Sequence, residues 1–168
     1  IAATFTSTGA PAFFLHPVEA LHGDAGLVAE GDIALVLSKS GAGDELDGVL
    51  PLFARLGVPV IALTESAGSP LARAARAVIA FGPLEEAGSI GGAPTTSALA
   101  AMALGDALAV KLAHERGFRA DDFHFLHPGG VLGRRASLRV ADVMHQGPDL
   151  PVVAAAASLR DALGSIMA

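Results

Sequence analysis

Apolar residues in this chain follow two kinds of pattern, short continuous runs and sets spaced three or four positions apart. A short continuous run predicts a strand covered on both faces, as in a parallel sheet. Runs of this kind occupy residues 12–15, 33–37, 58–63 and 77–81. Helical spacing predicts helices at residues 1–8, 18–22, 44–56, 69–76, 98–116 and 121–126. Because strands and helices alternate, the sequence predicts an α/β fold with helices on both faces of a parallel sheet.

Glycine and proline residues mark the ends of several predicted helices. Ser69-Pro70 is a strong helix start, because Ser is a good N-cap and Pro suits the first helical position. Gly57 and Gly117 stand where helices commonly end on glycine. Pro51 lies inside the predicted helix at 44–56, so we expect a kink there or a lost hydrogen bond to the carbonyl of Asp47.

The segment between the strand at 33–37 and the helix at 44–56 is built of small residues, S-K-S-G-A-G. Such a backbone turns tightly and exposes N–H groups, and the next helix presents a positive dipole end. A phosphate group fits this junction, although a plain strand-to-helix turn has the same local pattern. Ligands of parallel sheets bind at the carboxyl ends of the strands. We therefore expect the loops at 38–45, 64–69 and 85–96 to form the site.

Composition narrows the class of protein. The chain has 168 residues, of which 52% are hydrophobic, so it can form a domain with a substantial core. It has no cysteine, which excludes disulfides and thiolate metal sites and favours the cytoplasm. A net charge of −6 without Trp or Tyr gives no footprint for nucleic acid. The apolar run at 98–110 is interrupted by Gly105 and Asp106, and we expect it to be too short for a membrane span.

Three residues are candidates for proton transfer. Glu45 and Glu86 are the carboxylates nearest the predicted strand ends, and a base there could move a proton between adjacent carbons of a sugar. His127 stands in a rigid H-P-G-G turn. The alternative for a lone glutamate is a solvated surface carboxylate, which is the commoner case, and the alternative for His127 is a turn histidine hydrogen-bonded to the backbone. His16, His22 and Asp24 are weak metal candidates, because their spacing fits no standard zinc pattern, so no metal is expected. Neither a dinucleotide fingerprint nor a Walker loop is present.

Several blocks of sequence resemble a known family. The S-x-S-G after a buried strand and the G-A-P-T-T-S that opens a long helix resemble the sugar isomerase (SIS) domain. Three blocks are similar to the bacterial D-arabinose 5-phosphate isomerases within that family: H-P-V-E-A-L-H-G-D-A-G, G-A-P-T-T-S-A-L-A-A-M-A-L-G-D-A-L-A-V and R-G-F-R-A-D-D-F-H-F-L-H-P-G-G-V-L-G-R. The tail resembles the opening of a CBS domain. The resemblance implies an SIS domain at 1–138, with a flavodoxin-like sheet, and a CBS domain that begins at 139–168.

The resemblance also implies an activity. Members of the family interconvert D-arabinose 5-phosphate and D-ribulose 5-phosphate through an enediol, for lipopolysaccharide synthesis, as cytoplasmic tetramers without a cofactor. Their catalytic residues correspond to Glu45, Glu86 and His127, and the histidine is thought to reach a neighbouring subunit. Their phosphate-binding residues correspond to Ser38, Ser40, Gly41, Thr95 and Thr96. A sugar-phosphate sensor without catalysis, or an isomerase of another phosphosugar, remains an alternative.

The sequence departs from the family pattern at two places. The family has a strand and a lysine-containing G-x-G-K-S-G loop ahead of the helix predicted at 1–8, and no residue of this sequence matches that loop. Lys39 stands where the family usually has Asn, which could add charge to the phosphate loop.

Overall fold

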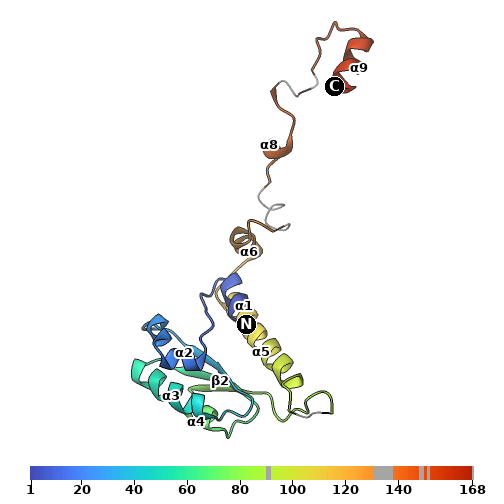
Figure 1. Ribbon diagram of the computed structural model, residues 1–168. Helices are drawn as coiled ribbons and strands as arrows, with labels where there is room; N and C mark the ends of the chain where they lie inside the picture. Colours follow the sequence, from blue (N-terminus) through green and yellow to red (C-terminus); the bar gives the residue numbers. More distant parts are fainter. Residues whose placement is uncertain (90–91, 131–137, 148–149, 151, 168) are drawn as a thin grey trace. The chain divides into compact units, whose positions relative to one another are not determined.

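The computed structural model describes residues 1–89, 92–130, 138–147, 150 and 152–167. It divides into two units, Ile1–Phe123 and His124–Ala168, and each is described by itself below (Figure 1). Two parts of the expected motifs, residues 90–91 of the glycine-rich loop and residues 131–134 after H-P-G-G, lie outside the described residues.

The first unit contains a parallel sheet of three strands, β1 (Ala34–Leu37), β2 (Val60–Thr64) and β3 (Ala77–Ala80). β2 lies in the middle, with Ala34 of β1 opposite Val60 and Ala77 of β3 opposite Ile61. Helices connect the strands, as parallel neighbours require. The predicted α/β class with a parallel sheet is therefore confirmed.

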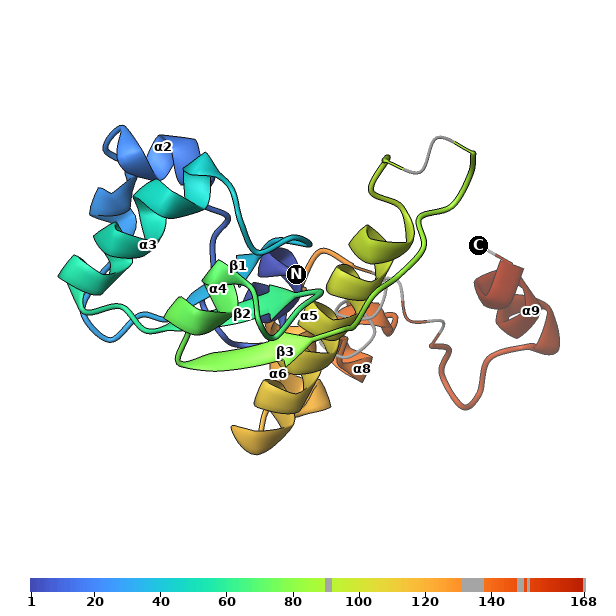
Figure 2. The same cartoon turned by 90° about the horizontal axis from the view of Figure 1, so that it is seen from below.

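Helices cover both faces of this sheet. On one side lie α2 (Pro17–Leu21), α3 (Asp44–Leu56) and α4 (Pro70–Ala74), and on the other lie α1 (Ala2–Ser7) and α5 (Thr96–Glu115) (Figure 2). A short 3-10 helix, η1 (Asp24–Leu27), follows α2. The main core forms where α2, α3 and α4 meet the sheet. Its buried residues are Ala20, Leu46, Val49, Phe53, Val58, Val60, Ala62 and Leu71.

The strand expected at residues 12–15 does not form. Phe13 and Phe14 are 50% and 79% exposed, and the carbonyl of Ala12 accepts a hydrogen bond from the Thr6 hydroxyl at 2.9 Å. A strand exists only with a paired neighbour, and none of the described strands pairs with this segment. The expectation of four strands is therefore wrong for the part of the chain described here, which has three.

β1 is also less buried than its sequence suggests. Its first three residues are only half-buried and Leu37 is exposed, whereas in β2 every residue except Ile61 is fully buried. β1 forms an edge of the described sheet and pairs only with β2. The expectation that β1 is buried on both faces is wrong, and the fully enclosed strand is β2.

Local sequence signals predicted the end of α3 and the start of α4. α3 ends on Gly57, which has φ +71°, and the hydroxyl of Ser69 accepts the N–H of Ala72 to cap α4 at 3.1 Å. α4 ends at Ala74, two residues earlier than expected, because Arg76 already donates its N–H to Val60 and leads into β3. α3 continues through Pro51 to Leu56.

The apolar run at 98–110 lies within α5, a continuous 20-residue helix. By length and composition alone the whole helix α5 could cross a membrane, whereas the run at 98–110 covers only part of it. Core helices of soluble proteins pass the same test. α5 packs against α1 and β2, and its buried residues are Ser97, Gly105, Ala109 and Ala113.

The remaining helices follow α5. α6 (Ala120–Leu126) spans the division between the two units, and α8 (Val140–Val143) and α9 (Leu159–Met167) belong to the second unit. The start of α9 is held by Ser158, whose hydroxyl donates to the Asp161 carboxylate at 2.7 Å. The boundary at residues 138 and 139 and the resemblance of the tail to a CBS domain stay predictions.

Candidate active site

The three loops that follow the strands lie together at one edge of the sheet, as expected. Backbone hydrogen bonds join the first two: Ser38 N–H donates to Leu63, and Glu65 N–H donates to Lys39, at 3.1 and 3.0 Å. Two more bonds join Thr64 and Glu65 to the segment just after β3, from Phe81 N–H to Thr64 and from Gly82 N–H to Glu65, at 3.0 and 3.1 Å, and the Lys39 ammonium donates to Glu86 of the third loop at 2.7 Å. The loops therefore form one connected surface.

Gly41 fixes the shape of the first loop. Its φ is +62°, and a Cβ there would lie 2.3 Å from the hydroxyl oxygen of Ser69 and 2.9 Å from that of Thr64. The Gly41 carbonyl also accepts the N–H of Leu71 at 2.9 Å. Only glycine allows the backbone to pass this close to the α4 N-cap and to β2. The loop conformation is thus set by the two elements beneath it.

The N-terminus of α3 opens next to this loop. Its N-cap residue is Gly43, and no side chain caps it. Exposed Glu45 stands in the first turn together with Asp44 and Asp47, where the helix dipole favours ionised carboxylates. The candidate base Glu45 and the Ser38–Gly41 turn therefore lie a few residues apart at the same strand-to-helix junction.

The hydroxyls of the loop make turns within it. Ser38 accepts the N–H of Gly41 at 3.1 Å, and Ser40 donates to the carbonyl of Ala42 at 3.0 Å. These hydroxyls hold the loop in a compact form, at the position expected for a phosphate group.

Glu86 connects the third loop to α5 and to the first loop. One carboxylate oxygen accepts the N–H groups of Thr95 and Ser97 at 2.9 and 3.2 Å, and the Thr95 hydroxyl at 3.1 Å. The other accepts the Ser97 hydroxyl and the Lys39 ammonium, the latter at 2.7 Å. The carboxylate therefore caps the N-terminus of α5, whose N-cap residue Thr95 makes no side-chain cap of its own.

These contacts govern the charge of Glu86. The Lys39 ammonium, then the Ser97 and Thr95 donors, hold the pKa of Glu86 far below its usual range, and its side chain is only 3% exposed. The hydrogen bond to Glu86 raises the pKa of Lys39. A carboxylate stabilised in its charged form by so many donors is a weak proton acceptor.

The structure brings together most of the expected site residues, although not all of them. Ser38, Ser40, Gly41 and Glu45 share one loop and helix start, and direct bonds link Lys39 of that loop to Glu86. The Thr95 hydroxyl donates to Glu86 and accepts the N–H of Ala87 at 2.7 Å, so its one donor is engaged. Half-buried Thr96 is the first residue of α5.

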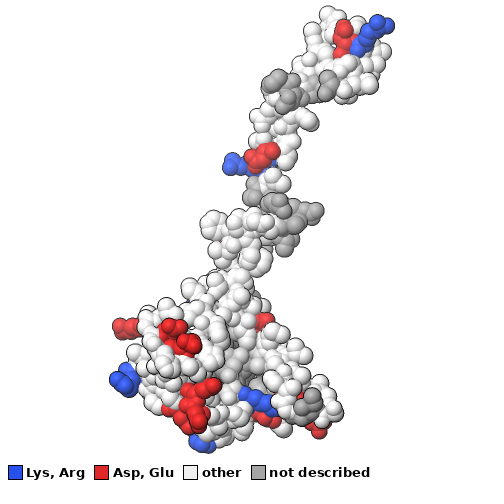
Figure 3. All heavy atoms as spheres, in the orientation of Figure 1, with Lys and Arg blue, Asp and Glu red and all other residues white. Residues whose placement is uncertain are grey.

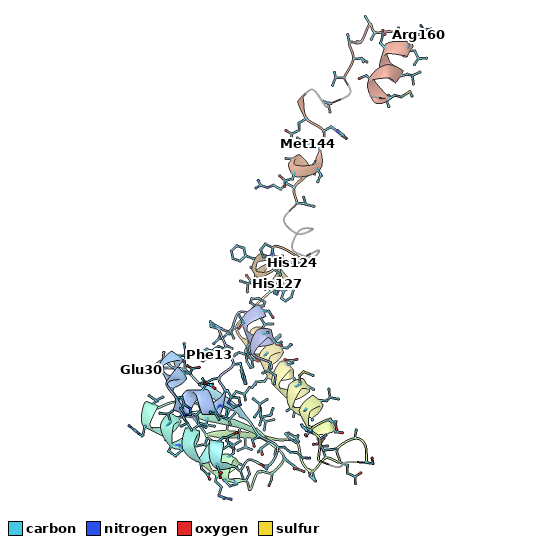
Figure 4. All side chains as sticks on the ribbon, in the orientation of Figure 1. Phe13, Glu30, His124, His127, Met144 and Arg160 are labelled. Atoms are coloured by element: carbon cyan, nitrogen blue, oxygen red, sulfur yellow. The ribbon has the colours of Figure 1, made fainter. Side chains whose placement is uncertain are left out.

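His127, in the H-P-G-G turn, is described separately. It belongs to the second unit, just after α6, and its backbone N–H donates to the carbonyl of His124 at 3.1 Å (Figure 4). The expected tight turn is present, since Gly130 N–H donates to the His127 carbonyl at 3.3 Å.

Sequence reasoning missed the roles of Ser97 and of the Lys39–Glu86 pair. Ser97 is 4% exposed and donates twice to Glu86. The cap of α5 comes from a carboxylate 11 positions before Ser97, outside the range of the usual capping patterns. The only sequence signal for the pair was the charge of Lys39 in an otherwise neutral loop.

The weak metal candidates use their ring nitrogens locally. Nδ1 of His16 accepts the N–H of Val18 at 3.3 Å, and Nδ1 of His22 lies 2.8 Å from the Val18 carbonyl. The described residues contain no group of three potential metal ligands.

On the face drawn in Figure 3, Lys and Arg side chains are isolated among Asp and Glu and form no basic patch.

The pH dependence of stability should report the Glu86 contacts. Because the folded pKa is lowered, Glu86 contributes stability above its ordinary value of 4.5, and this is lost as the pH falls through the folded pKa. Urea unfolding of the wild type and Glu86→Gln should therefore differ by a constant amount near neutral pH, and the difference should shrink at acidic pH. A difference that stays constant down to about pH 2 would contradict the lowered pKa.

Comparison with known proteins assigns the class. The family model of the SIS domain matches residues 1–111, which is more than half of the chain. The parallel sheet and the Ser38–Gly41 loop of this chain agree with that match. The chain therefore belongs to the SIS domain family.

Individual relatives are more specific. The chain is similar to proteins named arabinose 5-phosphate isomerase KdsD from Pseudomonas aeruginosa PAO1 (50% identity) and Escherichia coli K12 (49%), in each case over 97% of this chain and 50% of the relative. A solved structure of an E. coli CFT073 protein in complex with arabinose 5-phosphate is 38% identical, with a TM-score of 0.70, and covers 76% of this chain and 68% of that one. The chain spans about half the length of the curated relatives it matches.

Proposed function

We propose that this chain carries the catalytic domain of an aldose–ketose isomerase that interconverts D-arabinose 5-phosphate and D-ribulose 5-phosphate, for lipopolysaccharide synthesis. The observation that supports this most is the identity of 49–50%, over 97% of the chain, to proteins named arabinose 5-phosphate isomerase. The connected loops at the strand ends supply the Ser/Gly turn for a phosphate and an exposed carboxylate next to it.

In the proposed reaction the open-chain aldose loses the proton on C2 to a base, which forms an enediol. The base returns a proton at C1, while a second group moves a proton from the oxygen on C2 to the oxygen on C1, so that the aldehyde becomes a hydroxymethyl group and C2 becomes the ketone. Proton transfer by a positioned side chain contributes about 10²–10⁴-fold to such steps.

We assign the base to Glu45. Its side chain is exposed at the open N-terminus of α3, beside the Ser38–Gly41 turn. Glu86 is the weaker candidate, because five donors already bind its carboxylate. Glu86 then acts on the site through Lys39 and α5.

His127 is proposed as the group that transfers protons at the ring oxygen and the hydroxyls. It would act in the cytoplasm within a homotetramer, across a subunit boundary, and the tail from residue 139 would begin a CBS domain. These parts of the proposal follow from the resemblance to the family.

Ligand-induced stabilisation tests the substrate class. The full-length protein should be stabilised by arabinose 5-phosphate, by about 2.7 kcal/mol at a hundredfold excess over Kd, because a ligand of the native state shifts the unfolding equilibrium. D-arabinose at equal concentration should leave the unfolding midpoint unchanged. Scanning fluorimetry measures both, and a coupled assay follows ribulose 5-phosphate. Equal shifts from both sugars would contradict the phosphate site, and a shift by arabinose 5-phosphate without turnover would favour a sensor.

A further inference from the structure

Both the backbone carbonyl and the side-chain ammonium of Lys39 are hydrogen-bonded. Its backbone carbonyl accepts the Glu65 N–H at 3.0 Å and the Thr64 hydroxyl at 3.1 Å. Its ammonium donates to Glu86 at 2.7 Å. A flexible side chain is thereby fixed in one place at the carboxyl ends of β1 and β2.

The cap on α5 has enough donors without this lysine. Four other hydrogen bonds, all from Thr95 and Ser97, bind the Glu86 carboxylate. Solvent partly screens this ion pair, because its lysine is partly exposed although Glu86 is buried. The Lys39 side chain is 38% exposed, and an ammonium has three donors, of which Glu86 accepts one. Part of the ammonium therefore faces solvent beside the Ser38–Gly41 turn.

The charge around this turn explains why a cation is needed there. The first turn of α3 carries Asp44, Glu45 and Asp47, and Glu65 acts electrostatically on Lys39. These carboxylates repel a phosphate dianion and offset the attraction of the helix dipole. Of the cations described nearby, Arg73 is engaged with the carbonyl of Gly68. Lys39 is the cation within the turn itself.

We propose that Lys39 binds the phosphate group of the substrate and that Glu86 is the positioning residue that holds its ammonium at the strand ends. This proposal rests on the proposed function for the identity of the substrate. It makes Lys39 a residue that sets the affinity of the site for phosphorylated sugars. It also gives Glu86 a role that requires no proton transfer.

The test compares three variants of the full-length protein. Lys39→Met keeps most of the side-chain stem and removes the charge, Lys39→Arg keeps the charge, and Lys111→Met removes an exposed lysine that is paired with Glu115 on α5. Steady-state kinetics with arabinose 5-phosphate give KM and kcat, and competitive inhibition by inorganic phosphate gives an inhibition constant. Thermal unfolding shows whether each variant is folded.

We expect Lys39→Met to raise KM and the phosphate inhibition constant about 10- to 100-fold, as for loss of one charge-assisted hydrogen bond, with kcat within about threefold of wild type. Lys39→Arg should restore both constants to within about threefold, and Lys111→Met should match the wild type. Added KCl should raise the KM of the wild type more than that of Lys39→Met, because salt screens the charge.

Two results would overturn the proposal. One is a KM and phosphate constant for Lys39→Met that equal those of Lys111→Met. The other is a loss of kcat and of thermal stability that Lys39→Arg does not restore, because that pattern indicates a structural role. A wild type without isomerase turnover would refute the proposed function instead. In that case calorimetry with inorganic phosphate on the wild type and Lys39→Met still decides the role of Lys39.

Discussion

Glu45→Gln is expected to reduce kcat of the full-length protein by about 10²–10⁴-fold, with KM changed by no more than about threefold. Glutamine is nearly isosteric with glutamate but cannot accept a proton from carbon. Glu45 is exposed at the start of α3, so its replacement leaves the core intact. The measurement is steady-state turnover of arabinose 5-phosphate, together with exchange of the C2 proton with deuterated water followed by NMR.

Asp47→Asn is the matched control. Asp47 is also an exposed carboxylate in the first turn of α3, so this variant loses the same charge at the same helix end. The interaction of a charged side chain with the helix dipole contributes only about 0.3–1 kcal/mol, so its loss alone should leave kcat within about threefold of the wild type. Turnover by Glu45→Gln equal to that of Asp47→Asn would remove Glu45 from the mechanism. Glu86 would then become the candidate for the catalytic base.

Gly41→Ala is expected to destabilise the first unit by about 2–5 kcal/mol and to abolish phosphosugar binding. The new Cβ would lie 2.3 Å from the Ser69 hydroxyl oxygen and 2.5 Å from its Cβ, at a φ of +62°. Overpacking of this kind costs about 1–3 kcal/mol, and a left-handed conformation costs a residue with a Cβ about 1–2 kcal/mol. The loop must then move away from β2 and α4, which displaces Ser38, Ser40 and Lys39.

Gly57→Ala separates the two causes. Gly57 has a similar φ of +71°, but nothing lies within 4 Å of a Cβ built there. This variant should show the conformational cost alone, and it should bind arabinose 5-phosphate like the wild type. Urea unfolding gives the stability of each variant and calorimetry gives its affinity. Equal destabilisation of both variants would show that the contact with Ser69 does not constrain the loop.

Local patterns in the sequence determined most of the elements and their ends. The helical spacing at 44–56, the glycine at 57 and the Ser69-Pro70 pair each act within a few residues, so their effects are visible without the fold. The same holds for the small-residue turn at 38–43, since a strand followed by Ser and Gly encodes its own tight geometry. The alternation of strands and helices was sufficient to predict the parallel sheet.

Tertiary structure decided which strand lies in the centre and which apolar run forms no strand. β1 and β2 have similar apolar sequences, but β2 is enclosed because it pairs on both edges, and β1 is half exposed because it pairs on one. Residues 12–15 have strand composition and no partner among the described strands. Pairing depends on neighbours distant in sequence, and a local pattern carries no information about them.

The same reason applies to the site. The sequence by itself determined that Ser38, Gly41 and Glu45 lie at one strand-to-helix junction, because they are close together in the chain. Only the tertiary structure joined Lys39 to Glu86, which lies 47 positions away, and made that carboxylate the cap of α5. The sheet register brings the two loops to the same edge, and the donors gathered there lower the pKa of Glu86. The chemistry of a carboxylate depends on what surrounds it, and two glutamates of equal standing in the sequence have different surroundings in the fold.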